Sequence, residues 1–342
     1  MKLQRNAIFV ERIQLLQVTI CMKNRIEWAD MVKGICAFLV ILVHTEKAEC
    51  YALLFRPFFL FAFFFVSGYF VKEKNHFFKE LIKTICILLI SLLVKFVYLY
   101  VTVHEIMSVD TILGGIYQTH KFYPVYPPII WFVPCIFVAK QIFISIYRWI
   151  KNEYFRIAVC IALSVIGIFL GIRRIFLPWH IQTALISQVF LLGGYLLKKY
   201  ESFVQNNLKI LLAVSSLGYI FLITRKPLEA DLALLNVSDW AQYLLAAVFG
   251  IGMLVCFCIF CKSNKVIMYA GRNSLFLFVF QNYLITSFNR FFIKVGILED
   301  RYVVSLVTTV LTFVCLCSLC VLRDSLFNFV NAKLQKSFRP LI

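Results

Sequence analysis

The sequence predicts an all-α, polytopic membrane bundle of about ten transmembrane helices, with both termini in the cytoplasm. Of the 342 residues, 62% are hydrophobic and only 15% are charged, and the mean hydropathy is +0.86. A soluble domain cannot hide that much apolar surface, because its water-facing positions have to be polar. The apolar residues also gather in runs long enough to cross about 30 Å of hydrocarbon as helices.

The predicted spans follow one another along almost the whole chain. A helix that crosses the bilayer needs about twenty mostly apolar residues. Runs that meet or approach this length lie near residues 31–50, 53–71, 81–103, 129–147, 157–172, 180–197, 208–224, 239–261, 273–292 and 303–322. The longest connection, 104–128, carries Gly114-Gly115 and three prolines, so we expect a large outer loop there.

The distribution of Lys and Arg sets the predicted orientation. With the N-terminus inside, the inner segments hold more than twice as many Lys and Arg residues as the outer segments. This bias is typical of the cytoplasmic side of a membrane protein. The net charge of +18 then suits anionic membrane lipids rather than nucleic acid. We therefore expect a multi-pass protein of the cytoplasmic membrane. Its single transmembrane domain would cover 25–325, with a cytoplasmic tail at 1–24 and a basic cytoplasmic tail at 326–342.

The first predicted span carries ionisable residues along one face. Asp30 and Lys33 lie near its start, and His44 follows Lys33 by eleven residues. At 100° per residue this separation is about 1100°, so Lys33 and His44 share a face and lie about 16 Å apart along the axis. An ionisable residue deep in an apolar helix indicates a function. The structural interpretation is that Lys33 reaches the headgroups and pairs with Asp30, while His44 bridges two helices.

Other polar or aromatic residues within the runs allow two interpretations each. Lys95 lies in the middle of a span with Tyr98 one turn later, and it either lines a cavity or pairs with a carbonyl or an acid. Trp131 lies near the outer surface, where its ring suits both sugar stacking and the interfacial aromatic belt, and the belt is the favoured interpretation. Ser67-Gly68 favours close packing of two helices over a role as a nucleophile.

The twelve cysteines indicate no disulfide framework, because most lie inside apolar runs, where Cys packs as a small hydrophobe. The spacing C-x-C-x-x-C occurs twice, over 256–261 and 315–320. No His or acidic residue accompanies either triplet at ligand spacing, so we expect no metal. The chain also lacks a nucleophile elbow, a Gly-rich phosphate loop and a paired-carboxylate motif.

Five segments, taken in order, carry the motifs of one known family. The first places a basic residue, ten residues and then a histidine in the order Lys33-x10-His44. The others lie at 57–70 (ending in Ser-Gly-Tyr-Phe), 130–134 (Ile-Trp-Phe-Val-Pro), 177–198 and 269–275 (Tyr-Ala-Gly-Arg-Asn-Ser-Leu). Together they resemble the acyltransferase-3 family of integral-membrane acyltransferases, most closely its fucose 4-O-acetylase-like subgroup, over about 25–325.

The resemblance implies an acyl-CoA donor on the cytoplasmic side and an acceptor hydroxyl, usually on a sugar, at or beyond the membrane. It implies that His44 is the catalytic histidine, either as a general base or through a transient acyl-histidine. Lys33 would bind a phosphate of the donor. Arg272, beside Asn273 at an inner helix start, is a second phosphate-binding candidate, although it equally fits simple anchoring on the inner side.

Two positions depart from the family's pattern. Gln281 stands where the ninth helix commonly has a histidine, and Gln182 stands where the sixth helix often has an acid. Glutamine can position a hydroxyl but cannot transfer a proton near neutral pH, so general acid–base catalysis would depend more heavily on His44.

The expected function is O-acyl transfer, and more narrowly O-acetyl transfer, from acetyl-CoA to a cell-surface saccharide or lipid-linked glycan. Two alternatives are a permease or flippase for a glycan or small metabolite, and a catalytically degenerate family member. The residues expected to contact substrate or line its cavity, besides His44, Lys33 and Arg272, are Asp30, Lys95, Trp131, Gln182 and Gln281.

Overall fold

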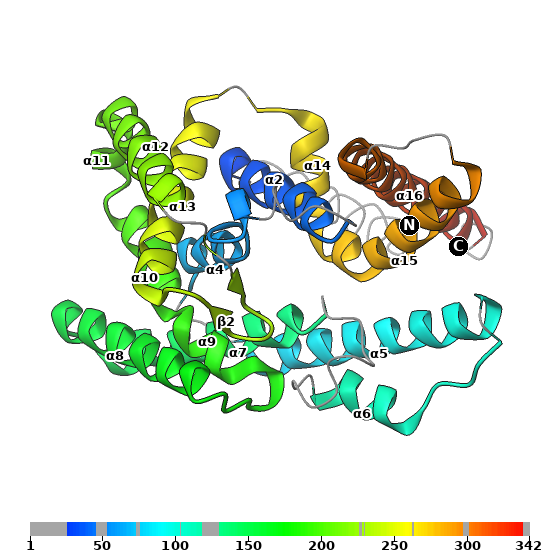
Figure 1. Cartoon of the computed structure of the whole chain (residues 1–342), viewed down its shortest axis with the longest axis horizontal. Helices are drawn as coiled ribbons and strands as arrows, with labels where there is room; N and C mark the ends of the chain where they lie inside the picture. Colours follow the sequence, from blue (N-terminus) through cyan, green and yellow to red (C-terminus); the bar gives the residue numbers. More distant parts are fainter. Residues whose placement is uncertain are drawn as a thin grey trace, which may run out of the picture.

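The chain folds into a bundle of helices (Figure 1). The computed structural model describes residues 26–45, 53–72, 76–102, 104–117, 130–225, 228, 230–261, 263–296 and 301–337. The elements in the first half are α2 (Glu27–Val43), α4 (Phe59–Tyr69), α5 (Phe77–Thr102), α6 (Val109–Tyr117), α7 (Phe132–Trp149) and α8 (Glu153–Ile172). Those that follow are η2 (Pro178–His180), α9 (Ile181–Ile186), α10 (Gln188–Lys199), α11 (Glu201–Asn206), α12 (Leu208–Arg225), β1 (Ala230–Asp231), β2 (Asn236–Val237), α13 (Trp240–Phe260), α14 (Lys265–Arg272), α15 (Ser274–Val295) and α16 (Arg301–Ser337).

Each predicted span overlaps a helix of the structure, which confirms the all-α membrane bundle. Six described helices are long and apolar enough to cross a membrane, namely α5, α7, α8, α12, α13 and α16. The number rises to seven if the bent pair of η2–α9 and α10 counts as one span. The exact count of ten, like the inner location of both termini, stays a prediction.

The segments predicted as an outer loop and as the C-terminal tail both contain helix. Within the predicted loop 104–128, α6 forms nine residues of helix, and residues 118–129 lie outside the described residues. At the other end, α16 continues to Ser337, well into the predicted tail 326–342. The predicted tail 1–24 lies outside the described residues.

The first predicted span, α2, lies at the centre of the bundle. It contacts α4, α13, α14, α15 and α16, and Figure 1 shows it surrounded by these elements. Eleven of its 17 residues are buried. A helix that is apolar on most sides belongs in the core of a large bundle, because every face then meets another helix.

Two glycines let α2 and α14 touch through their backbones. A Cβ atom on Gly34 would lie 2.0 Å from the carbonyl oxygen of Ile267. A Cβ atom on Gly271 would lie 1.9 Å from the carbonyl oxygen of Asp30. Neither position has room for a side chain, so the two helices can hold this contact only with glycine at both places.

A second pair of glycines joins α4 to α10 in the same way. A Cβ on Gly68 would lie 1.9 Å from the carbonyl oxygen of Leu191, and one on Gly194 would lie 1.8 Å from that of Phe65. The close helix packing predicted for the Ser-Gly motif at 67–68 is therefore present in the structure.

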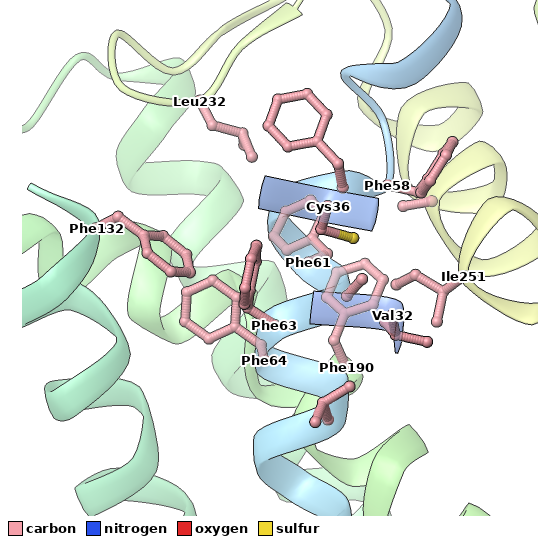
Figure 2. Packing of buried hydrophobic residues seen from close by; sticks show 14 of the residues in the cluster. Val32, Cys36, Phe58, Phe61, Phe63, Phe64, Phe132, Phe190, Leu232 and Ile251 are labelled. Carbon is pink, nitrogen blue, oxygen red and sulfur yellow. The ribbon is translucent and has the colours of Figure 1, made fainter. Parts of the chain in front are cut away.

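Aromatic side chains of α4 fill the centre of the core (Figure 2). Phe61 stacks on Phe190 of α10 with the ring centroids 4.1 Å apart. Phe63 and Phe64 both meet Phe132 of α7 edge-on, with centroids 5.6 and 5.3 Å away. Such stacked and edge-to-face pairs stabilise by about 0.5–1.5 kcal/mol each beyond the burial of their area. The aromatic layer thus joins α4 to α7 and α10, and α4 in turn packs against α2.

The sixth predicted span is broken in the structure. The segment from Pro178 to Ile186 runs at 53° to α10, and the break falls at Ser187. Just before this segment becomes α-helical, Trp179 and His180 adopt positive φ angles of 56° and 50°. Residues other than glycine rarely adopt positive φ angles, so the surrounding packing has to maintain this backbone conformation.

The connection between α12 and α13 folds into a small antiparallel hairpin, in which Ala230 pairs with Val237 and Asp231 with Asn236. The Asp231 Oδ1 atom accepts hydrogen bonds from the backbone N–H groups of Ala233 (2.8 Å) and Leu234 (3.1 Å). An aspartate whose side chain accepts from backbone N–H groups two and three residues later stabilises the turn that it begins. Residues 230, 232, 233 and 235 are buried, so the hairpin packs into the bundle rather than extending away from it.

Candidate active site

A cavity of about 190 Å³ lies beside the C-terminal end of α2. Its wall combines polar side chains with aromatic ones, as small-molecule sites commonly do. The polar residues that line it are His44, Arg56, Asp231 and Tyr243, and the aromatic residues are Phe59, Trp131, Phe132 and Phe278. The charge distribution predicts that this end of α2 faces the outer side of the membrane.

His44 follows the last residue of α2, and its ring is exposed to this cavity. Its Nδ1 atom lies 2.7 Å from the carbonyl oxygen of Val40, one turn earlier. A carbonyl oxygen can only accept, so Nδ1 carries the proton of the neutral ring and Nε2 carries the lone pair. The local structure of the helix end therefore selects the tautomer that can take a proton from a hydroxyl group at Nε2.

Arg56 and Tyr243 lie in the same cavity and are joined to the hairpin and to each other. Nη1 of Arg56 donates to the carbonyl oxygen of Ala230 at 3.4 Å, and the hydroxyl of Tyr243 donates to the carbonyl oxygen of Arg56 at 3.2 Å. No sequence pattern singled out Arg56, Asp231 or Tyr243. The one available signal was the position of Arg56 immediately before the 57–70 motif.

Trp131 forms part of the cavity wall, as expected of a residue that contacts substrate. It is buried, and its ring lies over the ring of His180 with the centroids 4.6 Å apart. A residue of the interfacial aromatic belt would face lipid, so the burial of Trp131 favours the cavity over the belt.

At the other end of α2, the two predicted phosphate-binding cations converge on Asp30. Nζ of Lys33 lies 2.6 Å from Oδ1, and Nε of Arg272 lies 3.1 Å from Oδ2. The carboxylate is buried, whereas the side chains of Lys33 and Arg272 are 27% and 31% exposed. The pairing of Lys33 with Asp30 predicted by the structural interpretation is thus present, and the second cation leaves the cluster with a net positive charge.

The contact between α2 and α14 sets the position of this cluster. Arg272 is the last residue of α14, and Gly271 beside it touches the backbone of Asp30. The chain then turns at Asn273, and α15 begins at Ser274. Asn273 accepts a hydrogen bond from Arg323 of α16 at 2.7 Å, and Arg323 is itself paired with Asp324 at 2.7 Å, so its charge is compensated.

Three other predicted site residues do not line the cavity beside His44. Lys95 is partly exposed on α5 and has no hydrogen bond or ion pair within the part of the chain that the structure describes. Gln182 and Gln281 are buried, and the Oε1 atom of Gln182 accepts from the backbone N–H of Leu177 at 3.1 Å. The Nε2 atoms of both glutamines are buried without a partner among the described residues. Their substrate contacts stay predictions.

Among the described residues, no three His, Cys, Asp or Glu side chains gather closely enough to hold a metal ion. This includes the cysteine triplets of α13 and α16, where Cys256, Cys258 and Cys320 are buried among apolar side chains.

A family model described as an acyltransferase domain matches residues 26–322. No curated protein and no solved structure matches the chain. The matched region covers more than four fifths of the sequence and includes both the cavity around His44 and the cation cluster around Asp30. Together with the apolar helices of the bundle, this match shows that the chain belongs to the acyltransferase-3 family of membrane acyltransferases.

Proposed function

We propose that the protein is an O-acetyltransferase that moves an acetyl group from cytoplasmic acetyl-CoA to a hydroxyl of a cell-surface saccharide or lipid-linked glycan. The observation that supports this most is the 2.7 Å contact between Nδ1 of His44 and the carbonyl oxygen of Val40. The Nδ1 atom is bound by the Val40 carbonyl, so the unprotonated Nε2 is left for the cavity. A base in this state suits the removal of a proton from an alcohol.

In the proposed reaction, Nε2 of His44 takes the hydroxyl proton while the acceptor oxygen attacks the thioester carbonyl carbon. The carbon–sulfur bond then breaks, and the CoA thiolate leaves and takes the proton back from the imidazolium. The Val40 carbonyl accepts the Nδ1–H throughout and keeps the ring in one orientation. No group is oxidised or reduced, and His44 ends the cycle in its starting form.

The cluster around Asp30 supports a donor site at the inner end. Lys33 and Arg272 can each donate to a phosphate of CoA, and Asp30 holds their side chains in place before the donor binds. Lys33 and His44 are about 16 Å apart along the helix axis, a distance comparable with an extended pantetheine arm. A phosphate held at Lys33 would thus allow the thioester to reach His44.

The size of the cavity supports a short acyl group. Its volume of about 190 Å³ is below the range of about 300–1,000 Å³ that is typical of sites for drug-sized ligands. An acetyl group and one face of a sugar ring suit such a space better than a long acyl chain does.

The decisive experiment compares wild type with His44→Gln in lipid nanodiscs, with radiolabelled acetyl-CoA and surface glycan from which O-acyl groups have been removed. We expect the label transferred to glycan to fall about 10²- to 10⁴-fold, the usual contribution of a general base. His76→Gln, on an exposed histidine at the start of α5, is the matched control and should retain activity. Transfer at the wild-type rate by His44→Gln would refute the proposed role.

Transport of a glycan or small metabolite is a second candidate, because one observation favours it. Transporters commonly contain broken helices, and the segment before α10 is bent by 53° at Ser187. Transport predicts movement of labelled glycan into vesicles without a covalent product. Mass spectrometry of that glycan separates the two functions, since only acyl transfer adds the mass of one acetyl group.

A further inference from the structure

The wall of the cavity beside His44 contains one cation and one carboxylate from distant parts of the chain. Arg56 directly precedes the motif that leads into α4, and Asp231 belongs to the hairpin between α12 and α13. Neither is part of the family motifs seen in the sequence. Both side chains lie next to the proposed base, where a bound acceptor would meet them.

Asp231 is fixed in position and retains an unused oxygen. Its Oδ1 atom accepts two backbone hydrogen bonds within the turn, at 2.8 and 3.1 Å. Its Oδ2 atom makes no hydrogen bond or ion pair to any residue that the structure describes. The turn therefore holds a charged acceptor group at the edge of the cavity, ready for a hydroxyl donor.

Arg56 is also fixed, and most of its donors remain available. Only Nη1 makes a hydrogen bond within the described residues, a long one of 3.4 Å to the Ala230 carbonyl. The backbone of Arg56 is held by the hydroxyl of Tyr243 at 3.2 Å. A guanidinium carries five N–H donors, so four of them can still donate to ligand oxygens.

We propose that Arg56 and Asp231 form the acceptor subsite and select an uncharged sugar unit that presents neighbouring hydroxyl groups. This inference rests on the proposed acetyl transfer and specifies its acceptor. Arg56 would donate to one hydroxyl oxygen and Asp231 would accept from an adjacent hydroxyl, which leaves the third hydroxyl to His44. Trp131 in the same wall offers an apolar surface for the face of the sugar ring.

The balance of charge is the reason to expect an uncharged sugar. Arg56 and Asp231 cancel each other, and the neutral His44 adds no charge. A carboxylate or phosphate on the acceptor would be attracted by Arg56 but repelled by the unused oxygen of Asp231, at a short distance where repulsion is strong. Hydroxyl groups, in contrast, can use both side chains at once.

The test measures acetyl transfer to the neutral and acidic oligosaccharides separated from the deacylated surface glycan. We expect the label on neutral oligosaccharides. In Arg56→Lys and Asp231→Asn, the KM for the neutral oligosaccharide should rise about 10- to 100-fold, as expected for the loss of a hydrogen bond to a charged group. The KM for acetyl-CoA should stay unchanged, because the donor cluster lies at the other end of α2.

The controls separate recognition from folding. Asp231→Asn keeps the Oδ1 acceptor that closes the turn, so the hairpin should survive. Asp239→Asn, at the N-cap of α13 next to the hairpin, is the matched control and should leave both KM values unchanged. Arg225→Lys, at the end of α12 near the same loop, serves this purpose for arginine.

Each outcome has one meaning. Absence of label on every oligosaccharide with wild-type protein would overturn the proposed transferase function itself. With wild-type protein, label on the acidic oligosaccharides instead of the neutral ones would overturn the subsite proposal alone. This outcome does not depend on whether the two variants fold. Folded variants with a wild-type acceptor KM, or with a raised KM for acetyl-CoA only, would also overturn it.

Discussion

The backbone contact between α2 and α14 predicts a specific result for Gly34→Ala. The new Cβ would start 2.0 Å from the carbonyl oxygen of Ile267, whereas ordinary contact begins at 3.4 Å. Because both atoms belong to rigid helix backbones, the helices have to separate by about 1.4 Å at this point, the difference between the two distances. Overpacking of this kind typically costs about 1–3 kcal/mol, and a clash with backbone belongs at the upper end.

The separation should also affect the proposed donor site. Arg272 lies beyond the contact, and its bond to Asp30 is already 3.1 Å long, so a shift of more than an ångström would break it. We therefore expect Gly34→Ala to lower the apparent Tm in detergent and to weaken acetyl-CoA binding measured by titration calorimetry.

Gly171→Ala is the matched control for this experiment. A Cβ there would meet a flexible side-chain methyl of Leu235 at 3.3 Å, which can move by a few tenths of an ångström. This variant should keep the wild-type Tm and acetyl-CoA affinity. The reasoning fails if Gly34→Ala behaves like Gly171→Ala in both measurements.

Two further predictions concern charged groups on the predicted inner side. Asp30→Asn should lower the apparent Tm, since charge-assisted hydrogen bonds are worth about 1.5–3 kcal/mol. It should retain acetyl-CoA binding, because both cations remain. Loss of binding, or a Tm equal to that of the exposed control Asp110→Asn, would contradict this. Arg156→Lys should cost about 1–3 kcal/mol, because the buried guanidinium lies over two tyrosine rings at 4.4 and 5.3 Å and lysine cannot stack in that way. A thermal melt against Arg148→Lys, an exposed arginine on α7, checks this, and equal melting of the two variants would disprove it.

The helices and the ends of α2 could be predicted because they follow from local rules. An apolar run of sufficient length has to become a helix in lipid, where every backbone polar group needs an internal partner. The helical repeat then places Asp30, Lys33 and His44 along one side without any knowledge of the neighbours. The structure adds that Arg272 reaches the same carboxylate, which depends on the glycine contact between two helices far apart in the sequence.

The cavity wall formed by Arg56, Asp231 and Tyr243 could not be predicted, because it depends on contacts between distant segments. The bond from Tyr243 to Arg56 joins residues 187 positions apart, and no periodic pattern relates them. The hairpin has only two residues in each strand and lacks an alternation of polar and apolar residues. It is held by the turn at Asp231 and by burial against the bundle. The bend at Ser187 was equally hidden, since the apolar run continues across it.

The small hairpin between α12 and α13 has a consequence for how acceptor preference can change. The proposed donor end is made by helices in backbone contact, where even one added methyl group would clash. The hairpin, in contrast, is a connection that meets the cavity through a short stretch, 230–233, between two helices that pack firmly on each other. Residues 230, 232, 233 and 235 are buried and have to stay apolar, whereas Asp231 can be exchanged with the helices and the proposed base, His44, left in place. Under the proposed acetyl transfer, one membrane core with a constant donor would modify different sugars, and grafting 230–237 from another family member is expected to transfer its acceptor preference.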